Sequence, residues 1–237
     1  MIGTQLFETK CDSELTSAAL SLEDKKDSIT YLVENVTEHG IIRIPNLKRV
    51  HKIILERTMI EKDANDEFRN KQVVVGYYDR NQKQNVIQYV PPKSEDIDIL
   101  MDKIVEFINL NINDNIFHAM LLKPIVVHAL IAILQPFSDG NTRLSRLVKC
   151  VDTWRLTNTI YNIKLDLPAL YLSDIYLQYY GQYRELIQKL SLSPNQENWD
   201  KWVRFNLFRI QDKLMLMATF LEENFSVTRD IRMILEL

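Results

Sequence analysis

The chain has 237 residues, of which 46% are hydrophobic and 26% are charged, and its 29 Lys and Arg residues are balanced by 32 Asp and Glu residues. This mildly acidic balance gives no general attraction for nucleic acid, so we expect no nucleic-acid partner. The two cysteines, Cys11 and Cys150, lack the spacing of a metal site. Seven prolines, five glycines and the scarcity of strand-like alternation predict a mainly helical, all-α body.

The first ten residues lack the apolar segment of a signal peptide. This favours a cytoplasmic location and leaves export by another route open. The most apolar stretch, residues 116–134, contains Lys123 near its centre. A central lysine costs a membrane-spanning helix roughly 2.5–3.5 kcal/mol. We therefore expect a buried helix that begins near Pro124, and no membrane partner.

The first elements in chain order are two amphipathic helices. Residues 29–36 place apolar side chains on one side, and Gly40 offers a stop. A second helix is predicted to begin near Pro45. These helices are interpreted as scaffold.

The next segment is the one convincing β-hairpin. Residues 72–89 place β-branched and aromatic residues on both sides of a polar turn at residues 79–82. Pro91 and Pro92 end the hairpin, and helical spacing resumes after Ser94. Further helices are predicted from Pro124 to about residue 134, from about residue 143, over residues 173–190 and 197–222, and finally toward Leu237. The missing stop signal raises the hypothesis that the chain is cut from a longer protein.

The loop QPFSDGNTRLSR, residues 135–146, joins two of these helices and carries the densest chemistry of the chain. Gly140 lies just before a helix, where backbone N–H groups are unpaired and the helix dipole is positive. With Asp139 to hold a cation and Arg143 and Arg146 on the first turn, the loop fits a triphosphate with Mg²⁺. The alternative is an ordinary helix start with a capping side chain and solvated arginines.

The loop resembles the signature of the Fic family, His-x-Phe-x-Asp/Glu-Gly-Asn-Gly-Arg-x-x-Arg. It departs from that signature at Gln135, in place of the histidine, and at Thr142, in place of the second glycine. His128, the segment EFRNKQVVVG and the helices after residue 172 are also similar to the family, so that the resemblance covers roughly residues 45–215. The positions that match the signature are Phe137, Asp139, Gly140, Asn141, Arg143 and Arg146.

The resemblance implies an all-α Fic fold with a small β-hairpin flap and the activity of a protein adenylyltransferase, which moves AMP from ATP onto a hydroxyl of a target protein. It divides the chain into an N-terminal helical extension at 1–44, a Fic domain at 45–215 and a C-terminal helix at 216–237. The implied cofactors are ATP and Mg²⁺, and the implied partner is a protein target. A homo-oligomer is a further arrangement that the sequence leaves open.

The resemblance also assigns roles to single residues. Asp139 would ligate Mg²⁺, Gly140 and Asn141 would line the phosphate site together with Thr142, Arg143 would contact the β-phosphate and Arg146 the γ-phosphate. Gln135, Asn141 and Arg143 occupy the catalytic positions. The flap, with Val74, Val75, Tyr77 and Tyr78, would hold a target segment as an added strand.

Gln135 stands at the position where the family has a histidine that accepts the proton. Imidazole titrates near pH 6.5, whereas an amide can only form hydrogen bonds. Loss of general base catalysis costs about 10²- to 10⁴-fold in rate, while nucleotide binding need not suffer. Thr142 puts a Cβ where the backbone approaches phosphate, and the related Doc toxins carry lysine there, so the orientation of the nucleotide stays open.

Four explanations of Gln135 stay open: a catalytically silent member that still binds, altered chemistry, a substitute base, or an engineered change. His128, two helical turns earlier, is interpreted as a buried imidazole rather than a substitute. The rival function is a non-enzymatic interaction module, a pseudoenzyme that binds a partner through the flap and groove. Nucleotide titration separates the two.

An inhibitory segment is the last expectation. Family members carry Ser/Thr-x-x-x-Glu-Gly/Asn, and TFLEEN supplies Thr219, Glu223 and Asn224. The glutamate would pair with Arg146 and block the γ-phosphate. A plain amphipathic helix with exposed glutamates is the alternative, and a similar segment near Glu23 fits less well because it lacks the hydroxyl residue.

Overall fold

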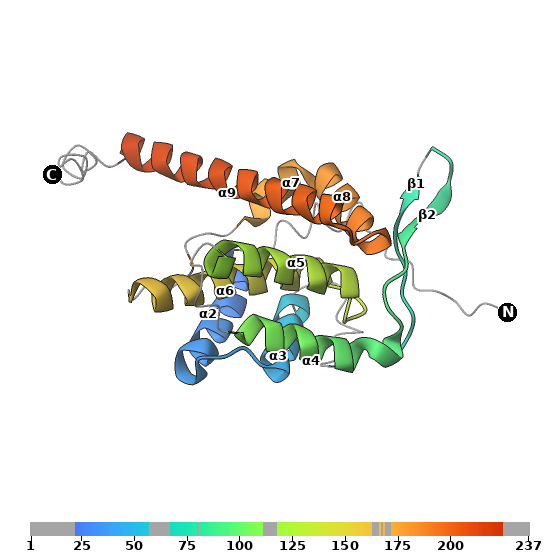
Figure 1. Ribbon diagram of the computed structural model, residues 1–237, viewed down its shortest axis with the longest axis horizontal. Coiled ribbons are helices and arrows are strands. Elements are labelled where there is room, and N and C mark those ends of the chain that lie inside the picture. Colours follow the sequence, from blue (N-terminus) through green and yellow to red (C-terminus); the bar gives the residue numbers. More distant parts are fainter. Residues whose placement is uncertain are drawn as a thin grey trace.

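The computed structural model describes residues 22–56, 67–79, 81–110, 118–162, 166, 168 and 172–224. Figure 1 shows helices in layers: α7, α8 and α9 lie on one side of α5 and α6, and α2, α3 and α4 lie on the other. A β-hairpin projects from one end (Figure 1). This confirms the predicted all-α fold with a small hairpin flap. The helix predicted toward Leu237 falls outside the described residues.

The two N-terminal helices confirm their predictions. Helix α2 spans Leu22–His39, and α3 spans Ile44–Glu56. Gly40 ends α2 with φ 71°, a left-handed conformation that glycine adopts at little cost, and its N–H donates to the carbonyl of Val36. The chain can therefore reverse between the two helices.

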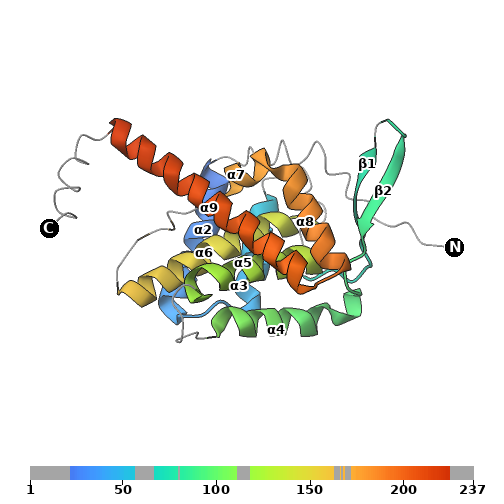
Figure 2. The same cartoon turned by 45° about the horizontal axis from the view of Figure 1, so that its top comes forward.

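Helix α5, Lys123–Leu134, is the centre of the molecule and is buried on nearly all of its faces. A helix that is hydrophobic all round must be covered on all sides. It follows the π-helical turn η3, His118–Leu122, and packs against α6, Asn141–Tyr161. Figure 2 shows both helices crossed by α9.

Two apolar cores lie on opposite sides of α5. The first joins α2, α3, α5 and α6 to α4, Ile97–Asn109, which follows the 3₁₀ turn η2, Ser94–Asp96. The second joins α5 to α7, Ser173–Gln178, α8, Tyr180–Leu192, and α9, Gln196–Asn224. Trp202 is fully buried in the second core, and its indole N–H donates to the carbonyl of Ile125. The loop after α5 is therefore clamped between two packed layers.

One expectation about the C-terminal third needs correction. The single helix predicted for residues 173–190 is divided at Tyr179, whose φ of −112° and ψ of 27° are not helical. The ring of Tyr179 lies 3.6 Å from the guanidinium carbon of Arg209 on α9, a tertiary contact that helical spacing does not reveal. The helix predicted for residues 197–222 is present as α9.

The predicted hairpin is present as β1, Val75–Asp79, and β2, Gln84–Tyr89, paired antiparallel with an irregularity between Val75 and Gly76. A Cβ at Gly76 would lie 2.2 Å from the carbonyl oxygen of Val86, so only glycine fits there. At its base, the Tyr89 hydroxyl donates to the carbonyl of Ala132 on α5 at 2.9 Å. This bond fixes the hairpin next to the end of α5.

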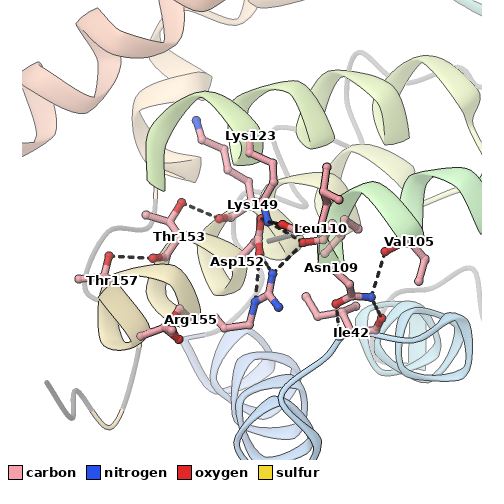
Figure 3. Close-up of polar contacts among 12 residues, drawn as sticks. Ile42, Val105, Asn109, Leu110, Lys123, Lys149, Asp152, Thr153, Arg155 and Thr157 are labelled. Carbon is pink, nitrogen blue, oxygen red and sulfur yellow. Dashed lines mark hydrogen bonds and ion pairs between the residues drawn. The ribbon is translucent and has the colours of Figure 1, made fainter. Parts of the chain in front are cut away.

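A buried charge network joins α4, α5 and α6 (Figure 3). The carboxylate of Asp152 is fully buried, 2.6 Å from Nη2 of Arg155 and 4.0 Å from Nζ of Lys123. Lys123 also donates to the carbonyl of Ile108 at 2.6 Å, and Arg155 donates to the same carbonyl at 2.8 Å. Among the described residues, no helix is long and apolar enough to cross a bilayer. The lysine that argued against a spanning helix is thus neutralised by a partner inside the fold.

We predict that Asp152→Ala lowers the free energy of unfolding by about 3–5 kcal/mol, because it leaves two buried cations without their carboxylate. Urea unfolding measures this loss. The control is Asp102→Ala on the exposed face of α4, which should change stability by less than about 0.5 kcal/mol. Equal losses in the two variants would contradict the role given to Asp152.

Candidate functional site

The loop begins at Gln135, which ends α5 in a left-handed conformation with φ 49° and ψ 62°. Its side chain is buried, and its amide is held at both ends: Nε2 donates to the carbonyl of Ala132 at 2.7 Å, and Oε1 accepts from Nδ2 of Asn141 at 2.8 Å. Gln135 is thus a fixed part of the loop. An amide held in this way can orient a neighbour but cannot accept a proton from a hydroxyl near neutral pH.

Asn141, fully buried at the start of α6, holds the loop from its other end. Its Oδ1 accepts from the N–H of Phe137 at 2.8 Å, while Nδ2 donates to the Phe137 carbonyl and to Gln135. One side chain therefore satisfies the backbone of a tight turn. The structure gives Asn141 this positioning role, and the phosphate contact expected of it stays a prediction.

Helix α3 supports the loop through His51. The imidazole stacks on the ring of Phe137, with ring centroids 3.7 Å apart and planes within 7°. Its Nε2 lies 2.7 Å from the carbonyl oxygen of Asp139. Phe137 is 1% exposed, which places it in the hydrophobic core.

Arg69 fastens the loop to the base of the hairpin. Its side chain is 6% exposed, and its guanidinium donates to the carbonyls of Leu134 and Gln135 on one side and of Lys71 and Pro92 on the other. Burial lowers the pKa of this guanidinium. Backbone carbonyls stabilise it without a carboxylate partner, so the hairpin and the loop form one rigid unit.

Gly140 occupies the turn before α6 with φ 74°. A Cβ at this position would lie 3.2 Å from Nε2 of His51 and 3.2 Å from a methyl group of Leu55. Its N–H donates to the carboxylate of Asp139. Glycine is therefore required here by backbone conformation and by packing against α3.

A pocket opens where the loop meets the hairpin and α8. Gln135 and Thr142 line it from the loop. The other lining residues come from the hairpin, α5 and α8 and are Val75, Gly76, Gln88, Tyr89, Ala132, Tyr180, Tyr183, Arg184 and Ile187. The pocket is partly open to solvent, and its cavity volume is about 50 Å³.

The charged residues of the loop divide into two groups. Arg143 lies 3.9 Å from the carboxylate of Asp139, and both side chains are partly exposed. Arg146, one turn further along α6, lines a second cavity together with Lys149 and Tyr176. The structure thus brings Gln135 and Thr142 to one pocket and Arg146 to the neighbouring one.

His128 is fully buried and does not reach the pocket directly. Its Nε2 lies 3.0 Å from the hydroxyl of Tyr183, which does line the pocket. Burial lowers its pKa well below the usual value, and the charges of Lys149 and Arg146 lower it further. An imidazole that resists protonation is a poor general base, so His128 does not replace the missing histidine.

The flap tyrosines point to opposite sides, as neighbouring residues of a strand do. Tyr77 lies against α8, with its ring centroid 4.6 Å from the guanidinium carbon of Arg184, whereas Tyr78 is 42% exposed. Arg184 also donates from Nε to Oε1 of Gln88 at 3.2 Å. Val74 and Val75 precede and begin β1, with Val74 buried and Val75 half-buried.

Sequence reasoning missed Arg184 and Lys149, because neither belongs to a short motif. Arg69 lies in a segment that the resemblance did include, yet its contacts to four carbonyls have no sequence signal. From the sequence alone, a basic residue inside an amphipathic helix is expected to be exposed. Only the packing of the folded chain shows that it is buried.

The inhibitory pairing expected for Glu223 and Arg146 is not formed in this structure. Thr219 and Glu223 are exposed near the end of α9, which reaches Asn224. The part of α9 beside Arg146 is Ile210, and Glu223 lies thirteen residues further along, about 20 Å at the rise of an α-helix. An inhibitory role would therefore require a different arrangement of α9.

Residues 42–151 match the model of the Fic/DOC family. The matched stretch begins before α3 and ends inside α6, so that it contains the hairpin, α5 and the whole loop. The matched stretch is slightly less than half of the chain, and it includes the loop that resembles the Fic signature.

Solved structures share the fold at low sequence identity. A Fic family protein from Desulfovibrio desulfuricans G20 superposes with TM-score 0.58 at 16% identity, over 88% of this chain and 62% of its own. Fic-1 (residues 134–508) from C. elegans superposes with TM-score 0.53 at 18% identity, over 83% of this chain and 51% of its own. A Fic domain containing signaling protein from Bacteroides thetaiotaomicron VPI-5482 superposes with TM-score 0.56 at 12% identity, over 80% of this chain and 67% of its own. The chain thus spans about half to two thirds of the solved proteins that it matches.

We predict that Gly140→Ala lowers the free energy of unfolding by about 2–4 kcal/mol, from a left-handed backbone conformation and a crowded Cβ. Gly40→Ala is the matched control, since φ is 71° there but nothing lies within 4 Å of the added Cβ. It should cost only about 1–2 kcal/mol. Guanidinium unfolding curves measure the loss of unfolding free energy in each variant. Equal losses in the two variants would show that Gly140 is not packed against α3 in solution.

Proposed function

We propose that this protein binds a nucleoside triphosphate with Mg²⁺ at its Fic/DOC loop, on the scaffold of a protein adenylyltransferase whose transfer step is impaired by Gln135. The observation that carries the proposal is the pocket in which Gln135 and Thr142 meet the hairpin and α8, at the N-terminus of α6. ATP is the triphosphate that the resemblance implies.

The phosphate side of the proposed site is the start of α6. The first N–H groups of a helix have no intrahelical acceptor, and they carry the positive end of the helix dipole. Thr142 faces the pocket from this first turn. Arg143 and Arg146 add two cations within one further turn, which suits a polyphosphate.

Asp139 fits the role of a Mg²⁺ ligand. Its side chain is 17% exposed, and its neighbour Arg143 neutralises it in part. Within the described ranges, no group of three His, Cys, Asp or Glu side chains could hold a metal ion alone. Mg²⁺ is commonly bound by one or two carboxylates together with substrate phosphates, so Asp139 would hold the ion jointly with the nucleotide.

The hairpin is suited to hold a target segment. β2 faces the body, where Gln88 bonds to Arg184 and Gln188 of α8. Among the described residues, β1 pairs only with β2, so its outer edge keeps backbone groups that an extended peptide can pair with. A target docked there would bring a hydroxyl toward Gln135 at the base of the hairpin.

The transfer step needs an acceptor for the proton of that hydroxyl. Gln135 can hydrogen-bond the hydroxyl but cannot take its proton, and the buried His128 is held neutral. The same residues that support nucleotide binding therefore support weak transfer. Homo-oligomerisation and a cytoplasmic location stay predictions.

A non-enzymatic interaction module is the second candidate, favoured by the fully bonded amide of Gln135. In that case the loop would be a rigid support for the hairpin and its open edge. The two candidates differ in nucleotide binding, because the module needs none.

We predict that Gln135→His raises the transfer of label from α-labelled ATP to protein by about 10²- to 10⁴-fold, because an imidazole replaces the amide. The backbone at this position suits the change, since histidine is among the residues enriched at positive φ. Gln135→Ala is the control and should give no gain.

The measurement pairs the transfer assay with a nucleotide titration of each variant. If Gln135→His binds ATP but transfers no faster than the parent chain, base loss does not explain the impairment. If neither chain binds ATP while a peptide still binds the hairpin, the interaction module replaces the proposed function.

A further inference from the structure

Helix α9 carries exposed apolar side chains on the face that is turned away from the other helices. Its inner face is buried in the second core, where Trp202, Phe205 and Ile210 lie. On the outer face, Phe208 is 56% exposed and Met215 is 61% exposed. Figure 2 shows α9 crossing α5 and α6 on the outside of the molecule. A helix that packs by one face normally presents polar side chains on the other, so exposed Phe and Met side chains there indicate an interaction surface.

The residues of this outer face follow a seven-residue repeat. Six exposed residues succeed one another at intervals of four, three, four, three and four, and we call them the outer stripe: Arg204, Phe208, Gln211, Met215, Ala218 and Glu222. Alternating intervals of four and three residues are typical of the seam along which two helices pack in a coiled coil. At the rise of an α-helix the outer stripe is about 27 Å long.

The order of residues in the outer stripe is complementary to its own reverse. In an antiparallel pair centred on residue 213, Arg204 of one copy comes level with Glu222 of the second copy. Phe208 then comes level with Ala218, and Gln211 with Met215. A large side chain thus meets a small one, and opposite charges meet at both ends of the contact. Two-fold symmetry makes each of these contacts twice.

A parallel pair would lack this complementarity. It would bring Arg204 beside Arg204 of the second copy, and Glu222 beside Glu222. Like charges that face each other across an interface oppose association. The charge order of the stripe therefore selects the antiparallel arrangement.

The residues that flank the middle of the stripe are compatible with this contact. Leu214, on one side, is 53% exposed and adds an apolar side chain near the two-fold axis. Asp212, on the other side, would approach its own copy. Nη2 of Arg209 lies 3.2 Å from the Asp212 carboxylate in the same helix, so its charge is already neutralised in part.

We propose that a second copy of this chain docks on the outer stripe of α9, in an antiparallel contact between two α9 helices. Two helices that touch over this length form a small interface, so the dimer should dissociate at micromolar concentrations. The contact involves neither the Gln135 pocket nor the loop, and it is independent of nucleotide binding.

Sedimentation equilibrium of the whole chain tests the surface. The parent chain should show a reversible equilibrium between monomer and dimer at roughly 1–100 µM, and Phe208→Asp should leave the monomer alone. The matched control is Leu192→Asp at the end of α8, because Leu192 is 66% exposed and lies off the stripe. It should dimerise as the parent chain does. Both positions are exposed, and circular dichroism checks that each variant keeps its helices.

Charge reversal tests the antiparallel register. Arg204→Glu and Glu222→Arg should each weaken dimerisation by about tenfold or more, because each brings like charges together at both ends. The double variant, Arg204→Glu with Glu222→Arg, restores opposite charges and should regain the affinity of the parent chain. An equimolar mixture of the two single variants should form a heterodimer more readily than either variant dimerises alone.

Three results would overturn the proposal. A parent chain that is monomeric at every concentration would do so, and a loss of thermal stability in Phe208→Asp would then show that the same chain covers the stripe. A dimer that persists in Phe208→Asp would place the contact elsewhere. Single charge reversals that leave dimerisation unchanged would contradict the antiparallel register.

Discussion

The hydrogen bonds of Asn141 inside the loop are the constraint on which the site depends. One fully buried amide holds the backbone of Phe137 and the side chain of Gln135, and in doing so fixes the end of α5 to the start of α6. The stacking of His51 on Phe137 and the carbonyl contacts of Arg69 reinforce the same turn. With the turn fixed, the first amides of α6 keep one direction, which is the requirement for a preorganised anion site.

Rigidity and reactivity are separate properties of this loop. Gln135 makes two hydrogen bonds inside the turn, yet its amide cannot take up a proton from a hydroxyl. The surrounding charges act in the same direction, because Lys149 and Arg146 oppose protonation of the nearest imidazole, His128. A site of this kind favours binding over chemistry.

Some features of the loop and of the residues that support it could be predicted from the sequence, and others could not. Gly140, Phe137 and the helix that begins after them could be predicted, because glycine before a helix and an apolar anchor are local signals. The hairpin and α5 also followed from local spacing and from Lys123 and Pro124. The break at Tyr179 and the separation between Glu223 and Arg146 could not be predicted from the sequence. Both depend on how α9 crosses the other helices. The carbonyl contacts of Arg69 likewise arise only from packing between distant segments.

The most direct test of the central claim is calorimetric titration of the folded chain with ATP, once with Mg²⁺ and once with a chelator. The account predicts saturable binding to one site with Mg²⁺ and a loss of most of that affinity without it, since Asp139 and the phosphates share the ion. A folded chain that gives no binding under either condition would contradict it.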